Sequence, residues 1–251
     1  MHFASALSAL ACITVAIVLS MAPLHAADAK PLPPPPPKPR TPESALTPEI
    51  KDQHRHDAFL KRIAEGPVGL LFIGDSITDF FPSRGKDTWA KFAAYHPADF
   101  GISADRTEHV LWRLTNGELD GLDPKATVIM IGTNNIGHFS DEKSEWAAAG
   151  VAKIVETVRT KLPKTRILLL GVFPRDAKES QHRKQVTEIN AIIAKLADGK
   201  AVTYLDISEK FLTADGAIIK ELMPDNLHPD AKGYEVWYDA MWPTLEKLLA
   251  P

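Results

Sequence analysis

The amino-acid sequence predicts an α/β protein in which helices cover both faces of a parallel sheet. Five short apolar segments alternate along the chain with longer segments of amphipathic period. Strands that are apolar along nearly their whole length are buried on both faces, which is typical of parallel sheets. The predicted strands are 68–73, 98–102, 126–131, 166–170 and 201–205.

The segments before, between and after these strands carry apolar residues at helical spacing. Gly66-Pro67 ends the first segment and Pro163 ends the fourth, because proline cannot continue a helix. Strands and helices together indicate one α/β domain of about 200 residues, with no internal repeat in the sequence. The predicted helices are 49–64, 87–95, 107–115, 141–162, 178–196 and 229–249.

The composition is that of an ordinary globular protein. Of the 251 residues, 45% are hydrophobic and 24% are charged, and the net charge at pH 7 is −3. Because basic residues are not in excess, we expect no nucleic-acid partner. A homodimer is compatible with the sequence, which does not define the oligomeric state.

The first 29 residues are typical of a secretory signal peptide. Residues 3–22 are almost all apolar or small, and Pro23 and Ala26-Ala27 precede the return of charge. We therefore expect a secreted or periplasmic protein. The alternative is an uncleaved membrane anchor, because the apolar stretch is nearly long enough to span a bilayer. Cleavage would remove Cys12, the single cysteine of the sequence, and leave no thiol for a disulfide, a metal site or catalysis.

Residues 30–46 are predicted to form a proline-rich linker. The prolines from Pro31 to Pro39 favour a polyproline II conformation, which cannot pack as helix or sheet. A stiff stalk is the expectation, and a docking ligand for a proline-binding domain is the alternative. The folded domain is then 47–251.

The strongest functional signal is Gly74-Asp75-Ser76, directly after the first predicted strand. The glycine permits a tight turn, and the serine is left at the start of the next segment with its hydroxyl at the carboxyl end of the sheet. A serine alone is a poor nucleophile, so the rest of the chain must supply a base, a group that orients the base, and donors for an oxyanion.

Candidates for all three follow predicted strands or precede the last predicted helix. His228 can accept the Ser76 proton, and Asp225, three residues earlier, can orient the imidazole. The backbone N–H groups of Ser76 and Gly101 and the side-chain amide of Asn134 can donate to one oxygen. In an open α/β sheet these strand ends meet near a switch point. The residue types therefore favour acyl transfer.

These motifs resemble the four blocks of the GDSL/SGNH hydrolase superfamily, in order and over residues 50 to 249. The segments around Gly101 and Asn134-Asn135 look like the catalytic-subunit branch of platelet-activating-factor acetylhydrolase IB. The resemblance implies a flavodoxin-like three-layer α/β/α sandwich with a five-stranded parallel sheet and no cofactor. It also implies hydrolysis of short acyl esters by a triad of Ser76, His228 and Asp225, with an oxyanion hole made by Ser76, Gly101 and Asn134.

Three positions depart from the family pattern. Asp99 stands where an asparagine is frequent, Ala104-Asp105 replaces a Gly-Asp pair, and Asn135 replaces a widespread aspartate.

From the motifs and the resemblance together, we predict an exported serine esterase that removes short acyl groups, acetyl first, from an acetylated carbohydrate or a small alcohol. The alternative is a catalytically silent carbohydrate- or envelope-binding module on the same fold. We expect no metal, since metal-ligand spacing is absent from the candidate site.

Overall fold

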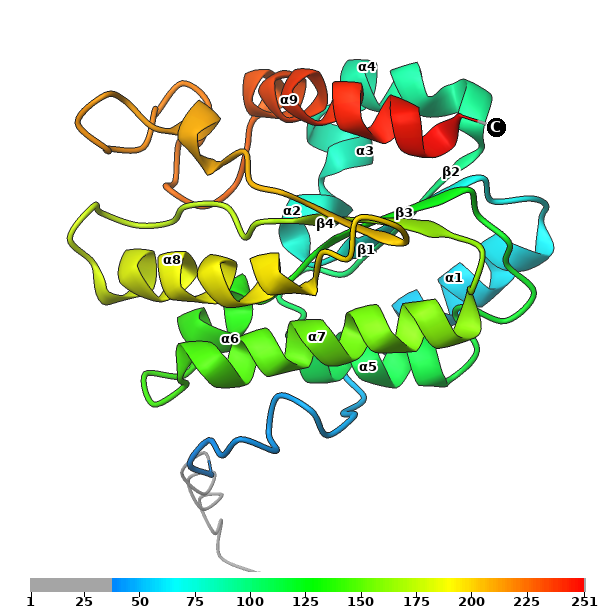
Figure 1. Cartoon of the computed structure of the whole chain (residues 1–251), viewed down its shortest axis with the longest axis horizontal. Coiled ribbons are helices and arrows are strands. Elements are labelled where there is room, and N and C mark those ends of the chain that lie inside the picture. The colour runs from blue at the N-terminus through cyan, green and yellow to red at the C-terminus, as the bar shows by residue number, and fades with distance from the viewer. Residues whose placement is uncertain (1–37, 251) are drawn as a thin grey trace, which may run out of the picture. The chain divides into compact units, whose positions relative to one another are not determined.

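The computed structural model describes residues 38–250, and residues from Pro39 on form one compact unit (Figure 1). Its centre is a sheet of five parallel strands in the order β2-β1-β3-β4-β5. This is the flavodoxin-like order, and it reverses direction between β1 and β3. The strands are β1 Leu70–Gly74, β2 Pro97–Gly101, β3 Ala126–Met130, β4 Arg166–Leu170 and β5 Val202–Leu205.

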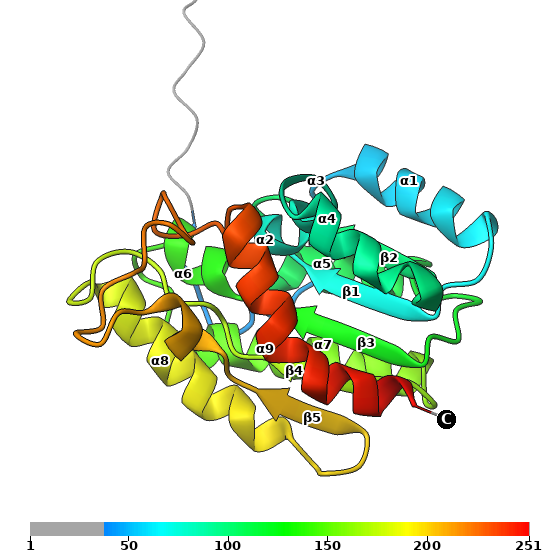
Figure 2. The same ribbon diagram turned by 90° about the horizontal axis from the view of Figure 1, so that it is seen from above.

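Helices cover both faces of the sheet, as the figures show from two directions (Figures 1 and 2). One layer contains α1 Gln53–Ala64, α5 Thr107–Thr115, α7 Ser144–Lys161 and α8 Gln181–Ile193 with its 3₁₀ extension η2 Ala194–Leu196. The other contains α3 Phe81–Arg84, α4 Lys86–Trp89, η1 Ala90–Tyr95, η3 Ser208–Phe211 and α9 Ala231–Leu249. Two short helices, α2 Ser76–Asp79 and α6 Thr133–His138, follow β1 and β3. The predicted three-layer α/β/α class is confirmed.

The strands are buried on both faces because neighbouring residues point into two different cores. Leu71 and Ile73 of β1 belong to the core under α5 and α7, whereas Leu70 and Phe72 belong to the core under α9. The second core is rich in aromatic rings, among them Phe92, whose ring centroid lies 5.3 Å from that of Phe72. A near-continuous apolar strand is therefore what this packing requires.

The helix starts differ from prediction where a polar side chain caps the backbone. The first helix begins at Gln53 instead of 49, because the Asp52 carboxylate accepts the Arg55 N–H at the N-cap. The single helix expected over 87–95 is divided into α4 and the 3₁₀ segment η1. Neither difference changes the order of elements along the chain.

The folded domain begins earlier than the predicted boundary at Thr47. Arg40 forms ion pairs with Glu108 and Glu142, and Ala45 is fully buried. The signal peptide predicted for 1–29 and the linker residues 30–37 lie outside the described residues. Within the described part of the chain, none of the helices combines the length and the apolar character that crossing a bilayer needs.

We predict that Phe92→Ala lowers the free energy of unfolding by about 3–5 kcal/mol, because a buried phenylalanine leaves a cavity when truncated. Phe92 is fully buried, with Phe72, Phe81 and Trp89 as ring neighbours. Urea unfolding measures the loss. Ile192→Ala is the matched control, since Ile192 is 38% exposed, and it should change stability by less than about 0.5–1 kcal/mol.

Candidate active site

Ser76 is the first residue of α2 and lies immediately past the end of β1. A Cβ on Gly74 would approach Thr78 Oγ1 to 2.1 Å and the Met130 carbonyl to 2.7 Å, so only glycine allows this turn. Asp75 caps α2, since its carboxylate accepts the Ile77 N–H at 3.0 Å. Burial raises the pKa of Asp75 to about 7. The Ser76 side chain is thus held at the sheet edge by a tightly packed, capped turn.

The structure brings Ser76, His228 and Asp225 into one hydrogen-bonded chain. Ser76 Oγ lies 2.9 Å from His228 Nε2, and His228 Nδ1 lies 2.7 Å from Asp225 Oδ2. An imidazole protonated at Nδ1 donates to the carboxylate and leaves Nε2 free to accept the serine proton. The Phe80 ring packs beside the imidazole, with centroids 5.4 Å apart.

The loop that carries His228 folds around the Asp225 carboxylate. Asp225 Oδ1 accepts the N–H groups of Leu227 and His228 at 3.0 and 2.7 Å. Asn226, the residue directly after Asp225, has a left-handed φ of 63°. Partial burial alone raises the pKa of Asp225, but the hydrogen bonds from His228 and Leu227 outweigh burial and bring this pKa below its ordinary value. The carboxylate therefore stays ionised opposite the imidazole.

The structure differs from the prediction that the N–H group of Gly101 is an oxyanion donor. The Gly101 N–H donates to Asp99 Oδ1 at 2.7 Å and is not available to a substrate. The absence of a side chain at Gly101 has another reason, since a Cβ there would lie 2.3 Å from the Asp79 nitrogen. The glycine lets the end of β2 pack directly against α2. The close approach that requires glycine at this position is therefore to α2 and not to a substrate.

The amide of Ala104, three residues further along the chain, is the alternative candidate donor. Ala104 has a left-handed φ of 64°, in the turn closed by the bond from the Asp105 N–H to the Ile102 carbonyl. Asn134 Nδ2 donates to the Asp105 carbonyl at 2.9 Å and thus lies on the same loop. Among residues 38–250, the N–H groups of Ser76 and Ala104 have no acceptor. The signal in the sequence is that Ala104-Asp105 stands where the family pattern has Gly-Asp, because glycine is the residue that adopts a left-handed φ most readily.

Two further residues hold the Asn134 turn and the His228 loop together. Arg175, which follows β4, donates through Nη1 to the Thr133 carbonyl at 2.9 Å. The next residue, Asp176, donates its N–H to the Asn226 carbonyl at 2.9 Å. One dipeptide thus links the residue before Asn134 to the loop that carries the imidazole. Sequence analysis missed this link, because neither residue belongs to a recognisable motif.

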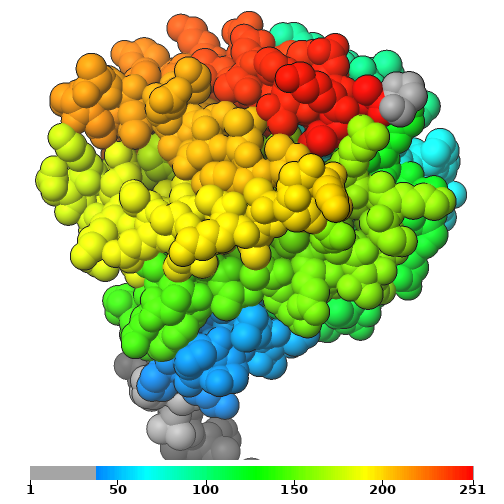
Figure 3. Space-filling view, in the orientation of Figure 1, coloured from blue at the N-terminus to red at the C-terminus, as the bar shows by residue number. Residues whose placement is uncertain are grey.

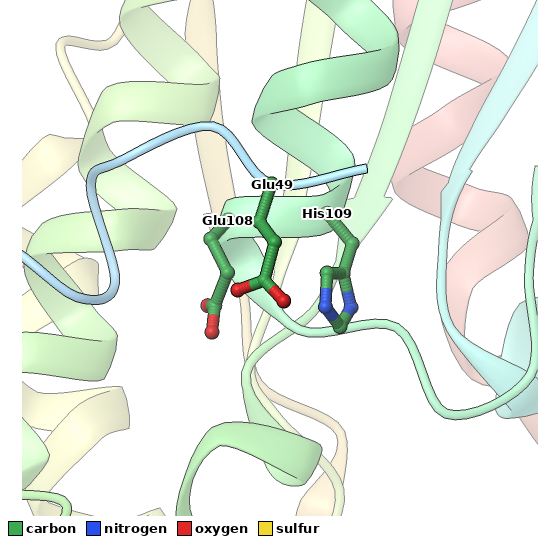
Figure 4. A group of neighbouring side chains, drawn as sticks. All are labelled: Glu49, Glu108 and His109. Atoms are coloured by element: carbon green, nitrogen blue, oxygen red, sulfur yellow. The ribbon is translucent and has the colours of Figure 1, made fainter. Parts of the chain in front are cut away.

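Glu49, Glu108 and His109 gather near the start of α5 in an arrangement that resembles a metal site (Figure 4). Arginine already supplies the positive charge there. Arg106 donates to Glu108 Oε1 at 2.6 Å through Nε and to His109 Nδ1 at 3.1 Å through its backbone N–H. Burial and the nearby Arg106 lower the pKa of His109 to about 3, so the ring stays neutral. We assign this cluster to packing of the loop before α5.

Fold and site together define a GDSL-type hydrolase. The family model for the GDSL-like Lipase/Acylhydrolase family matches residues 72–236, and the chain belongs to this family. The curated relatives include platelet-activating factor acetylhydrolase IB subunit alpha1 of Homo sapiens. It is 34% identical over 197 residues, which cover 78% of this chain and 83% of the human protein.

Solved structures share the fold at lower identity. A GDSL-like lipase from Bacteroides thetaiotaomicron superposes with a TM-score of 0.65 at 18% identity, covering 76% of this chain and 97% of that one. A catalytic mutant of an acetylxylan esterase from Geobacillus stearothermophilus superposes with a TM-score of 0.55 at 19% identity, covering 71% and 93%. These likenesses support the fold class.

Asp99, at the position where the family frequently has asparagine, is predicted to behave as a neutral side chain. Burial, with the negative charge of Asp79 nearby, raises the pKa of Asp99 to about 8 although Arg55 and Arg113 oppose the shift. Below about pH 4 the carboxyl is protonated in both folded and unfolded chains. Between about pH 4 and 8 only the unfolded chain releases this proton, so stability falls by at most about 1.4 kcal/mol for each pH unit.

Asp99→Asn should therefore be more stable than the natural protein, by a margin that grows from pH 4 to 8 and is then constant. Urea unfolding at pH 5 and pH 8 measures this margin. Asp239→Asn is the control, since Asp239 is exposed on α9. Equal margins for Asp99→Asn at the two pH values would contradict a neutral Asp99.

Proposed function

We propose that this protein is an exported serine esterase that hydrolyses short acyl esters, acetyl first, of a carbohydrate or another small alcohol. The observation that carries the proposal is the continuous chain from Ser76 Oγ through the His228 ring to Asp225, with separations of 2.9 and 2.7 Å. Both distances are within hydrogen-bond reach, as a nucleophile and its base require.

The reaction proceeds in two stages. His228 Nε2 takes the Ser76 proton while Oγ forms a bond to the ester carbonyl carbon, and the proton then passes to the departing alkoxide as the ester C–O bond breaks. In the second stage His228 deprotonates a water molecule, which attacks the acyl-serine. The acid leaves and the proton returns to Ser76 Oγ. Asp225 holds the Nδ1 tautomer and stabilises the imidazolium in both stages.

The oxyanion that forms in each stage needs donors aimed at one oxygen. We assign the Ser76 N–H, the Ala104 N–H and the Asn134 side-chain amide to this role. Asn134 Nδ2 uses one hydrogen on the Asp105 carbonyl, and its second hydrogen is available to the substrate. Loss of one such donor typically lowers kcat by about 10²–10³.

The proposed acyl and alcohol groups of the substrate are inferred from the names of similar proteins and not from the shape of a pocket. The human relative is named an acetylhydrolase and the Geobacillus structure an acetylxylan esterase, and both names favour acetyl esters. Export rests on the apolar residues 3–22 of the sequence. An assay of the protein with acetyl and butyryl aryl esters and with acetylated xylan separates these substrate classes.

We predict that Ser76→Ala abolishes hydrolysis of p-nitrophenyl acetate and leaves the fold intact, because only the nucleophilic oxygen is lost. Initial rates and thermal unfolding measure the two effects. The control is Ser83→Ala, since the Ser83 hydroxyl donates to the carbonyl of Phe80 in its own helical turn. Turnover by Ser76→Ala equal to that of the natural protein would eliminate the proposal. Glycan binding without turnover of any ester would favour the silent binding module.

Acid should stop the reaction by protonating the base, because His228 must be neutral to accept the serine proton. The lowered pKa of Asp225 keeps its carboxylate ionised opposite the imidazole as the pH falls. The value of kcat/KM should therefore fall with falling pH, by about tenfold for each unit once the base is protonated. Rates between pH 4 and 8 measure this profile. A flat profile would remove His228 from the base role.

A further inference from the structure

The residues that precede α1 form a strap across the layer of α5 and α7. We define this strap as residues 39–46, which the sequence places in a linker. Figure 3 shows the start of the described chain, in blue, packed against the green segments. Ala45 is fully buried, and its carbonyl accepts the Thr107 hydroxyl at 2.9 Å. A Cβ on Gly150 of α7 would lie 2.8 Å from that carbonyl, so the strap lies directly on the helix.

Arg40 is the most strongly held residue of the strap. Its Nη1 lies 2.8 Å from Glu108 Oε1 and its Nε lies 2.5 Å from Glu142 Oε2. Both carboxylate side chains are 0% exposed, and that of Arg40 is 6% exposed. Its backbone N–H donates to Asp141, and its guanidinium lies over the Phe139 ring. Two buried carboxylates thus depend on Arg40 for charge, and Arg106 is the second cation beside Glu108.

This ion cluster is joined to the Asn134 turn through the adjacent residue. Asn135 Nδ2 donates to Glu108 Oε2 at 3.1 Å and to the Thr107 hydroxyl at 3.0 Å. Asn135 Oδ1 accepts the Thr107 N–H at 3.0 Å. Both the nitrogen and the oxygen of the Asn135 side chain are therefore bonded to Thr107 or Glu108, which in turn contact Ala45 and Arg40. A shift of the Glu108 carboxylate would pass to Asn135 and from there to Asn134.

We propose that Arg40 is a positioning residue for the esterase reaction, acting through Glu108 and Asn135 on the oxyanion donor Asn134. The inference rests on the proposed function. Without Arg40, Glu108 keeps Arg106 as a partner, whereas Glu142 has no ion-pair partner among the described residues. Such an unpaired buried charge must take up a proton or move toward water. Either response disturbs the Glu108–Asn135 contact. The strap is then part of the catalytic domain and not only its connection to the proline-rich segment.

The test uses the full-length chain and compares Arg40→Met with the double variant Arg40→Met/Glu142→Gln. Arg40→Met should lower kcat for p-nitrophenyl acetate about tenfold or more with KM changed less than about twofold, because oxyanion donors act in the transition state. The double variant removes one buried negative charge with the positive one, and kcat should return to within about threefold of the natural value. Arg159→Met, which breaks the exposed pair with Asp198, is the matched control and should leave kcat unchanged.

Three results would overturn the inference: an unchanged kcat in Arg40→Met, a double variant as slow as the single one, or the same loss in Arg159→Met. If Arg40→Met does not fold, the double variant decides alone, since a natural kcat supports charge balance and a reduced kcat contradicts it. Ser76→Ala in the same assay separates this outcome from failure of the proposed function. Turnover that survives in Ser76→Ala removes the esterase site itself, whatever Arg40 does.

Discussion

The site depends on how closely the carboxyl ends of β1, β2 and β3 pack against the helix that begins at Ser76. Gly74 pairs with Gly101 on one side and with Met130 on the other, so the three strands end level. A side chain at Gly74 or at Gly101 would collide with backbone or hydroxyl atoms of α2 or β3. Because neither strand end has a side chain, the turn that carries Ser76 packs close to the ends of the strands. In this position Ser76 Oγ is within hydrogen-bond distance of His228, on the loop before α9.

Several carboxyl groups lie near these strand ends, and their surroundings shift their pKa values in different directions. Asp75 and Asp99 are buried with few opposing charges, and their pKa values are raised to about 7 and about 8. Glu108 is buried between two arginines, and their hydrogen bonds bring its pKa below the ordinary value although burial alone raises it. Asp225, which must be charged to assist the imidazole, is the half-exposed member, with a side chain 53% exposed. Solvent access and paired donors therefore decide which acid carries charge near neutral pH.

Most of the fold follows from local pattern. The strand Arg166–Leu170 and the helix Thr107–Thr115 have the predicted bounds, because apolar runs and amphipathic period are properties of short windows. The helix starts were less accurate where capping decided, as at Asp52. The strap was misjudged for a different reason. Composition next to a proline run indicates a linker. Nothing in residues 39–46 reveals that Arg40 forms ion pairs with Glu108 and Glu142, which are distant in sequence.

The sequence by itself determined the fold class, the family and the residue types of the site. The fold class follows from the hydrophobic periodicity, and the family and the residue types follow from four short motifs. Only the tertiary structure decided which backbone amide is free. Gly101 ends β2 and Ala104 lies three residues later in the following turn, and Asp99 accepts the N–H group of Gly101. Hydrogen-bond satisfaction is a property of three-dimensional neighbours, and so is the burial that raises the pKa of Asp99 and surrounds the ion pairs of Arg40.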